Sequence, residues 1–292
     1  MNTTLHRISQ SHDAQTGSTA PQSGQTWMAA LGRPHATLKR SDRTILADAA
    51  IVIDQDLTAT GYRLSVYDDM QAWAGLLASV GKFVPNAFDT KLKPARTGEA
   101  LGLVLRSPEG ELIATHGVRL YHLQRSLADH LATLSLFYAN PIEQMLAGEY
   151  LSIAGDARRY AETVEGQAVW IGGFWVRPDH RGKASNISTV LAFAARLLAA
   201  MRWGSHVVFS LTEPMWRNSK ASARIKNPDI YETVKWWRPQ LPEAERERRS
   251  EILLVVTEPD VPMARARAYL SGEDRLRIGL EPENPQANAT PV

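Results

Sequence analysis

The chain has 292 residues, of which 44% are hydrophobic and 22% are charged, with a formal net charge of +2. This composition is ordinary for a soluble globular protein, and the balanced charge gives no reason to expect a nucleic-acid partner. The absence of cysteine excludes disulfides, zinc–thiolate sites and cysteine nucleophiles. Neither an apolar signal-peptide core nor a membrane-length apolar run is visible, so we expect a cytoplasmic protein without a membrane partner.

The two ends of the chain differ in composition from its centre. Residues 1–42 are dominated by Ser, Thr, Gln, Gly, Asp and Pro, and residues 276–292 are similarly polar. Such segments bury too little apolar area to offset the entropy of ordering, which predicts a disordered tail at each end. Residues 43–275 are then expected to form a single domain.

The first part of the domain predicts a strand, a helix and a hairpin. Residues Ile45–Asp54 are compatible with either a strand or a short helix, whereas Tyr62–Tyr67 alternates as a strand does. Asp68 and Asp69 then precede an apolar helical stripe between residues 70 and 80. Two apolar runs flank the turn sequence Ser107-Pro108-Glu109-Gly110, which predicts an antiparallel hairpin over residues 100–121.

Residues 126–166 read mostly as helical and are interpreted as an insertion. Three helices are expected, over residues 127–137, 142–151 and 156–162. The insertion could form a lid or a wall of a substrate site, or it could serve packing alone. We favour packing, because its residues form no chemical constellation.

The most informative stretch runs from Gln167 to Leu211. Ala168–Val176 is an apolar strand pattern with Gly172 and Gly173 in its middle, which predicts a bulge or a close approach to the backbone. A polar turn follows, and Ser185 is the expected N-cap of a helix that ends at Gly204. Residues 206–211 then form a second short strand.

The turn between this strand and helix is a candidate anion site. A loop that enters a helix presents unpaired backbone N–H groups and the positive end of the helix dipole. Arg181 and Lys183 add full positive charge at the same place, so a phosphate is the natural ligand. An ordinary solvated turn with basic residues remains an alternative.

The segment from Phe174 to Ala184 resembles the core motif of the GNAT superfamily of acyl-CoA-dependent N-acyltransferases. The resemblance implies an α/β fold with a mixed, mostly antiparallel central sheet flanked by helices, and acetyl-CoA or another acyl-CoA as cosubstrate. The sequence departs from the motif at two positions. Ala184 stands where the family has glycine, and Asn186 stands where the family has glycine or alanine. The cosubstrate-binding residues that the resemblance implies are Phe174, Trp175, Val176, Arg181, Gly182, Lys183, Ala184, Ser185, Asn186 and Asn218.

The C-terminal part predicts a helix over residues 215–225, a strand over 252–256 and a last helix over 261–270. By the same resemblance, Tyr231 is the candidate general acid that protonates the departing thiolate. Alternatively, Tyr231 is an apolar filler beside Trp236 and Trp237.

Other catalytic signatures are missing from the sequence. It contains no Ser–His–Asp pattern, no phosphate-binding P-loop and no metal-spaced histidine cluster, so we expect no metal. Glu149, Glu162 or Glu165 could act as general base through a water molecule, and the sequence does not choose between them.

The resemblance therefore favours a GNAT-like N-acyltransferase that moves an acyl group from acyl-CoA to a small amine or amino-acid-like acceptor. One alternative is an enzyme similar to the acyl-homoserine lactone synthases or the N-acyl amino acid synthases, with a long-chain acyl thioester as donor. Another is a non-catalytic GNAT-like binding module.

Overall fold

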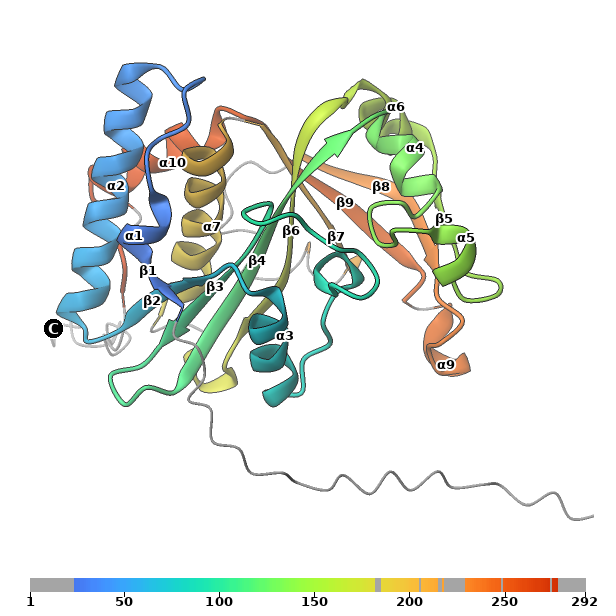
Figure 1. Cartoon of the computed structure of the whole chain (residues 1–292), viewed down its shortest axis with the longest axis horizontal. Coiled ribbons are helices and arrows are strands. Elements are labelled where there is room, and N and C mark those ends of the chain that lie inside the picture. The colour runs from blue at the N-terminus through green and yellow to red at the C-terminus, as the bar shows by residue number, and fades with distance from the viewer. Residues whose placement is uncertain are drawn as a thin grey trace, which may run out of the picture.

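The computed structural model describes residues 24–181, 185–204, 206–214, 217, 229–247, 249–273 and 275–277. Nine strands of this part of the chain form one sheet (Figure 1). They are β1 (Gln25–Thr26), β2 (Arg63–Tyr67), β3 (Ala100–Arg106), β4 (Leu112–Leu123), β5 (Tyr150–Ile153), β6 (Gly166–Val176), β7 (Val207–Thr212), β8 (Asp229–Trp237) and β9 (Glu251–Thr257). Their order across the sheet is β1-β2-β3-β4-β6-β7-β9-β8-β5. Only β6 and β7 are parallel, and every other neighbouring pair is antiparallel. The predicted mixed, mostly antiparallel sheet is confirmed.

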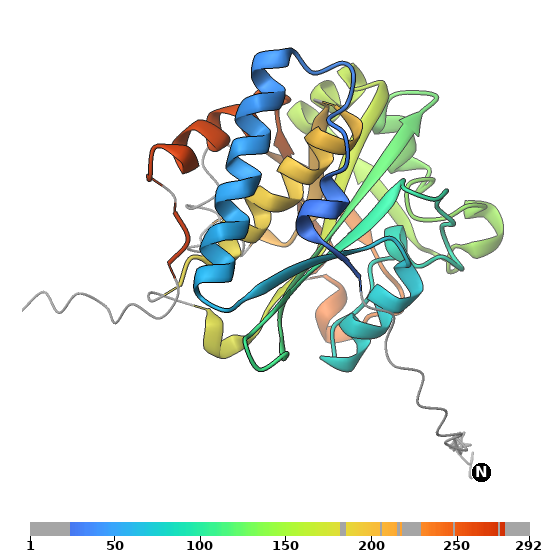
Figure 2. The ribbon, with the colours of Figure 1, turned by 60° about the vertical axis from the view of Figure 1, so that its left-hand side comes forward.

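Helices cover both faces of this sheet. They are α1 (Trp27–Leu31), α2 (Arg40–Ala59), α3 (Met70–Ser79), α4 (Leu127–Ala132), α5 (Pro141–Gln144), α6 (Gly155–Thr163), α7 (Ile187–Trp203), α9 (Glu243–Arg246) and α10 (Val261–Leu270), with 3-10 turns η1 (Asn86–Phe88) and η2 (Pro178–His180). Helices α1, α2, α7 and α10 share one hydrophobic core on one face (Figure 2). Residues of α3, η1, α4 and α6 form a second core on the other face.

The predicted N-terminal tail is wrong for residues 24–42, which are folded. They contain β1, α1 and the start of α2, and Trp27 is fully buried with its indole N–H donating to the Ala50 carbonyl at 3.3 Å. Trp27 and Leu31, one helical turn apart on α1, bury enough apolar surface to hold this short segment against α2. Residues 1–23 and 278–292 lie outside the described residues.

The predicted hairpin and the helix after Asp69 are confirmed, while the insertion is only partly helical. Helix α5 has four residues, and Tyr150–Ile153 is a strand that pairs with β8 instead of continuing a helix. Leu151 and Ile153 are buried, whereas Tyr150 and Ser152 are exposed, which is the alternation of an edge strand. Strand β8 was not predicted, and most of the helix expected over residues 215–225 lies outside the described residues.

Within the described residues, no helix has both the length and the apolar character needed to cross a bilayer.

Candidate active site

The parallel strands β6 and β7 separate from each other along their length. They pair only from Ala168 to Trp170 with Val207 to Phe209. Beyond this point β6 stays with β4, and β7 stays with β9. A cavity of about 740 Å³ lies where the two strands diverge, and it is lined from both faces of the sheet. Crevices beyond the carboxyl ends of parallel strands are common ligand sites. We therefore take the opening between the diverging parts of β6 and β7, called the wedge below, as the candidate active site.

Strand β6 carries a bulge at the wedge. Thr115 lies opposite Trp175 and Gly117 opposite Gly172, so two β6 residues, Gly173 and Phe174, face the single β4 residue between them. Gly173 has a φ of +59°, and its carbonyl accepts a hydrogen bond of 3.0 Å from the Thr115 hydroxyl. The bulge predicted from the glycine pair is confirmed, and it turns Phe174 into the cavity lining.

Three residues of α7 line the cavity at intervals of one helical turn: Ser188, Ala192 and Arg196. Arg196 is only 4% exposed. Its Nη1 donates to the Ala192 carbonyl at 2.9 Å, and its Nε lies 3.4 Å from the Thr257 hydroxyl. Burial lowers the pKa of Arg196 to about 10, and the charge of Arg265 acts in the same direction. The guanidinium is therefore still a cation at neutral pH.

His116 lies on β4, on the same side of the sheet as Arg196. Its ring meets Phe174 edge-on, with centroids 5.0 Å apart, and its Nδ1 is buried without a hydrogen-bond partner among the described residues. Burial, followed by the nearby Arg196 cation, lowers the pKa of His116 to about 3. The imidazole is therefore neutral at physiological pH and a weak base.

Aromatic rings line the opposite side of the cavity. Phe137 stacks on Trp236 at 4.6 Å and meets Trp170 edge-on at 5.4 Å. Glu149, one of the expected base candidates, holds this wall in place. Its carboxylate accepts from the Trp236 indole at 3.0 Å and from the Tyr138 hydroxyl at 2.8 Å. Both contacts serve the wall, and the sequence-based suggestion of Glu149 as base gains no support.

One carboxylate, Glu213, is present among the described residues that line the cavity. It directly follows β7, and it accepts a hydrogen bond of 2.7 Å from Nε of Arg249. Arg238 lines the same region, with its guanidinium 5.5 Å from the centre of the Trp236 ring. Sequence reasoning missed Glu213, although an acid between a strand end and Pro214 was a usable signal.

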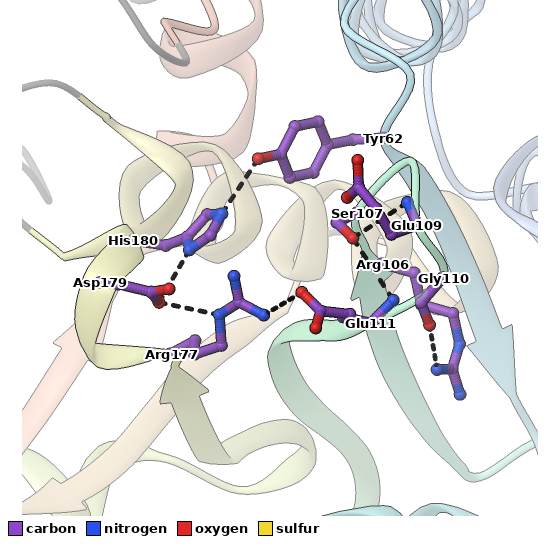
Figure 3. Close-up of polar contacts among 9 residues, drawn as sticks. All are labelled: Tyr62, Arg106, Ser107, Glu109, Gly110, Glu111, Arg177, Asp179 and His180. Atoms are coloured by element: carbon purple, nitrogen blue, oxygen red, sulfur yellow. Dashed lines mark hydrogen bonds and ion pairs between the residues drawn. The ribbon is translucent and has the colours of Figure 1, made fainter.

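The turn after β6 is held by a network of polar side chains (Figure 3). Arg177 donates to Asp179 at 2.8 Å and to Glu111 of the β3–β4 hairpin at 2.5 Å. His180 donates through Nδ1 to Asp179 at 2.9 Å, while its Nε2 accepts from the Tyr62 hydroxyl at 3.0 Å. The His180 hydrogen bond, followed by that of Arg177, lowers the pKa of Asp179 to about 2. The turn thus has a fixed start beside the wedge.

The described backbone of the predicted anion cradle is mostly occupied by protein. The amides of His180 and Arg181 donate to carbonyls within the turn, and that of Asn186 donates to the Arg277 carbonyl. Arg181 also donates through Nε to the Val176 carbonyl at 2.6 Å. The N-cap is Asn186 instead of Ser185, whose hydroxyl accepts from the Ile187 amide at 3.2 Å. Gly182, Lys183, Ala184 and Asn218 lie outside the described residues, so their contacts with phosphate stay a prediction.

The remaining predicted residues are dispersed. Val176 packs in the core under α7, and Trp175 pairs with Thr115 of β4. Among the described residues, Phe174 lines the cavity, whereas Trp175 and Val176 do not. Tyr231 lies on β8 and stacks on Tyr160 with centroids 4.8 Å apart. It is not among the described residues of the cavity lining, so its predicted role as general acid gains no support from its position.

Comparisons with known proteins give only distant structural matches. No protein-family model matches the chain, and no curated protein matches its sequence. NAA60 from Arabidopsis thaliana in complex with acetyl-CoA aligns with a TM-score of 0.39 at 12% identity, over 68% of this chain and 98% of that one. RimJ from Mycobacterium smegmatis in complex with CoA-disulfide aligns at 0.36 and 13% identity, over 82% and 88%. An uncharacterized protein from Bacillus halodurans aligns at 0.39 and 10% identity, over 73% and 92%.

The mixed, mostly antiparallel sheet flanked by helices that was expected from the sequence is the fold observed. That statement rests on the strand order, the parallel pair and the crossover helix of this chain. The alignments themselves are too distant to add to the argument.

Proposed function

We propose that this protein is an N-acyltransferase that takes an acyl group from acyl-CoA and transfers it to an amine. The observation that carries the proposal is the wedge between β6 and β7, with its bulge and its through-sheet cavity. Beyond Trp170, no described strand pairs with β6 on its β7 side. That edge can hydrogen-bond to the extended pantetheine arm of a CoA thioester as another strand would.

The chemistry needs little beyond positioning, because a thioester is already activated. A donor in the wedge and an amine entering from the aromatic side would meet at the bulge, where proximity replaces a bimolecular encounter. Backbone N–H groups of β6 would stabilise the negative charge that develops on the carbonyl oxygen. The turn through Lys183 would hold the CoA phosphates. This assignment is based on the sequence motif.

Glu213 is the proposed general base. The attacking nitrogen must lose a proton as it forms the amide bond, and a carboxylate on the cavity wall can accept it. Its ion pair with Arg249 fixes the direction of the carboxylate. His116 is a poor alternative, because its lowered pKa leaves it a weak base.

A second candidate keeps the site and changes the donor to a long-chain acyl thioester. The observation in its favour is the aromatic wall of Phe137, Trp170 and Trp236, which offers more apolar surface than an acetyl group needs. The two candidates differ in how affinity changes with the length of the acyl chain.

The test is calorimetric titration of the protein with CoA, acetyl-CoA and palmitoyl-CoA, followed by detection of thiol release with a panel of amines and amino acids. Ala192→Met places a longer side chain in the wedge from α7 and is expected to abolish CoA binding while the unliganded melting temperature stays near that of the wild type. Ala264→Met, at an exposed position of α10, controls for the change of residue type away from the cavity and should bind as the wild type does.

Failure of all three ligands to bind the wild type would refute the proposal. Full affinity in Ala192→Met would show that the donor does not occupy the wedge. Tighter binding of palmitoyl-CoA than of acetyl-CoA would select the second candidate.

A further inference from the structure

Among the residues that the structure describes, Arg196 is a buried cation without a counter-ion. It is 4% exposed on α7, and the described residues contain no ion pair with it. Within the described part of the chain, the one charge that perturbs its pKa is the like charge of Arg265, and its hydrogen bonds go to an uncharged carbonyl and a hydroxyl. A guanidinium withdrawn from water without an anion is unfavourable, so such a residue is unusual unless an anion joins it in the functional state.

The surroundings of Arg196 are open toward the cavity and are set up for an anion. Arg196 and His116 both line the cavity on the α7 side of the sheet. The buried Nδ1 of His116 has no partner within the described residues, and a hydrogen bond to the Leu191 backbone acts on the same ring. A neutral imidazole carries a single N–H, so His116 donates to the same ligand only in the tautomer with its proton on Nδ1. The guanidinium of Arg196 is the charged donor on this surface that matches a carboxylate.

The position of Arg196 along α7 identifies which part of a substrate would reach it. Ser188, Ala192 and Arg196 form one row, which begins in the first turn of the helix, next to the predicted phosphate loop. The row is about 12 Å long, at 1.5 Å per residue. A donor that enters with its phosphates at the loop and extends along this row therefore points its acyl end toward Arg196.

We propose that Arg196 binds the terminal carboxylate of the transferred acyl group, so that the preferred donor is the CoA thioester of a dicarboxylic acid. This assignment rests on the proposed acyltransferase function and specifies its donor. The thioester carbon reacts at the bulge, and the distal carboxylate remains bound to the guanidinium throughout the transfer.

The experiment compares succinyl-CoA with butyryl-CoA, which have acyl chains of equal length and differ in a terminal carboxylate or methyl group. Calorimetric titration of the wild type is expected to give about tenfold to a hundredfold tighter binding of succinyl-CoA. Arg196→Met should remove this preference and leave the affinity for butyryl-CoA unchanged. Arg196→Lys, which keeps the charge, should retain part of the preference.

The unliganded melting temperature separates this role from a structural one. Replacing an uncompensated buried cation by an apolar side chain of similar length should leave the melting temperature of Arg196→Met equal to or above that of the wild type. A large decrease would show that Arg196 holds the fold together, and it would overturn the proposal.

The other outcomes separate the two levels of the argument. Equal binding of succinyl-CoA and butyryl-CoA by the wild type would overturn the donor assignment and leave the acyltransferase proposal standing. Absence of binding by either thioester would overturn both. If Arg196→Met instead loses affinity only for free amino acids added to the butyryl-CoA complex, the carboxylate belongs to the acceptor, and the donor assignment is wrong.

Discussion

The bulge of β6 can be tested by replacing Gly173 with alanine. Gly173 has a φ of +59°, which disfavours any residue with a Cβ by about 1–2 kcal/mol. A Cβ built there would lie 2.5 Å from the ring carbon Cη2 of Trp73, which is fully buried. Overpacking of this kind adds about 1–3 kcal/mol. We therefore expect Gly173→Ala to lower the free energy of unfolding by about 2–5 kcal/mol.

Urea denaturation followed by fluorescence measures this change, and a thermal scan should show a decrease of about 4–15 °C. Gly75→Ala is the matched control, because Gly75 lies in α3 without a positive φ and has no atom within 4 Å of the new Cβ. That substitution should stabilise the protein by about 0.5–1 kcal/mol, since alanine is the better helix former.

A double-mutant cycle separates the two contributions in Gly173→Ala. Trp73→Phe removes the ring carbons that the new Cβ would meet, so the double variant should lose less stability than the sum of the single variants. The residual loss then reports the backbone conformation alone. A Gly173→Ala protein within about 0.5 kcal/mol of the wild type would refute the strained bulge and, with it, the geometry assigned to the wedge.

Two further predictions concern catalysis and acid stability. With an amine that is active in the acceptor panel, Glu213→Gln should lower kcat by about 100-fold at unchanged donor affinity, whereas Tyr231→Phe should leave kcat unchanged. The opposite result would support Tyr231 as the general acid and rule out Glu213 as the general base. The pKa of Asp179 is depressed to about 2 in the folded state, so its contribution to stability is present above pH 4 and is lost as the pH falls toward 2. The melting temperature of Asp179→Asn should therefore fall less between pH 5 and pH 3 than that of the wild type, and Asp48→Asn, exposed on α2, should follow the wild type. Parallel curves for Asp179→Asn and the wild type would contradict the network in Figure 3.

Local patterns in the sequence were sufficient to predict the strand and the helix that form the wedge. The strand over residues 168–176, its glycine bulge and the helix that ends at Gly204 depend on short-range periodicity and on backbone freedom, and all three are observed. The hairpin over residues 100–121 was equally readable, because its turn residues are adjacent in the chain.

The chemistry inside the wedge was not readable, because it is assembled from separate strands. His116 and Phe174 meet only through the register of β4 and β6, and Arg196 approaches them from a helix. In the sequence, Arg196 reads as an interruption of an apolar helix. Tyr231 was placed near the site by motif spacing alone, whereas its strand carries it to α6, where it stacks on Tyr160. Positions set by long-range pairing override such spacing.

The one parallel pair among the described strands explains why the cavity lies where it does. Antiparallel neighbours can be joined by tight hairpins, but β6 and β7 run in the same direction and need a crossover, which α7 supplies. The crossover places α7 over this pair, and the bulge at Gly173 leads β6 away from β7 under the helix. Helix α7 thus covers the wedge, and its residues 188, 192 and 196 line the cavity. Residues of β6, β7 and α7 line this cavity together, so the proposed donor site and Arg196 belong to one cavity.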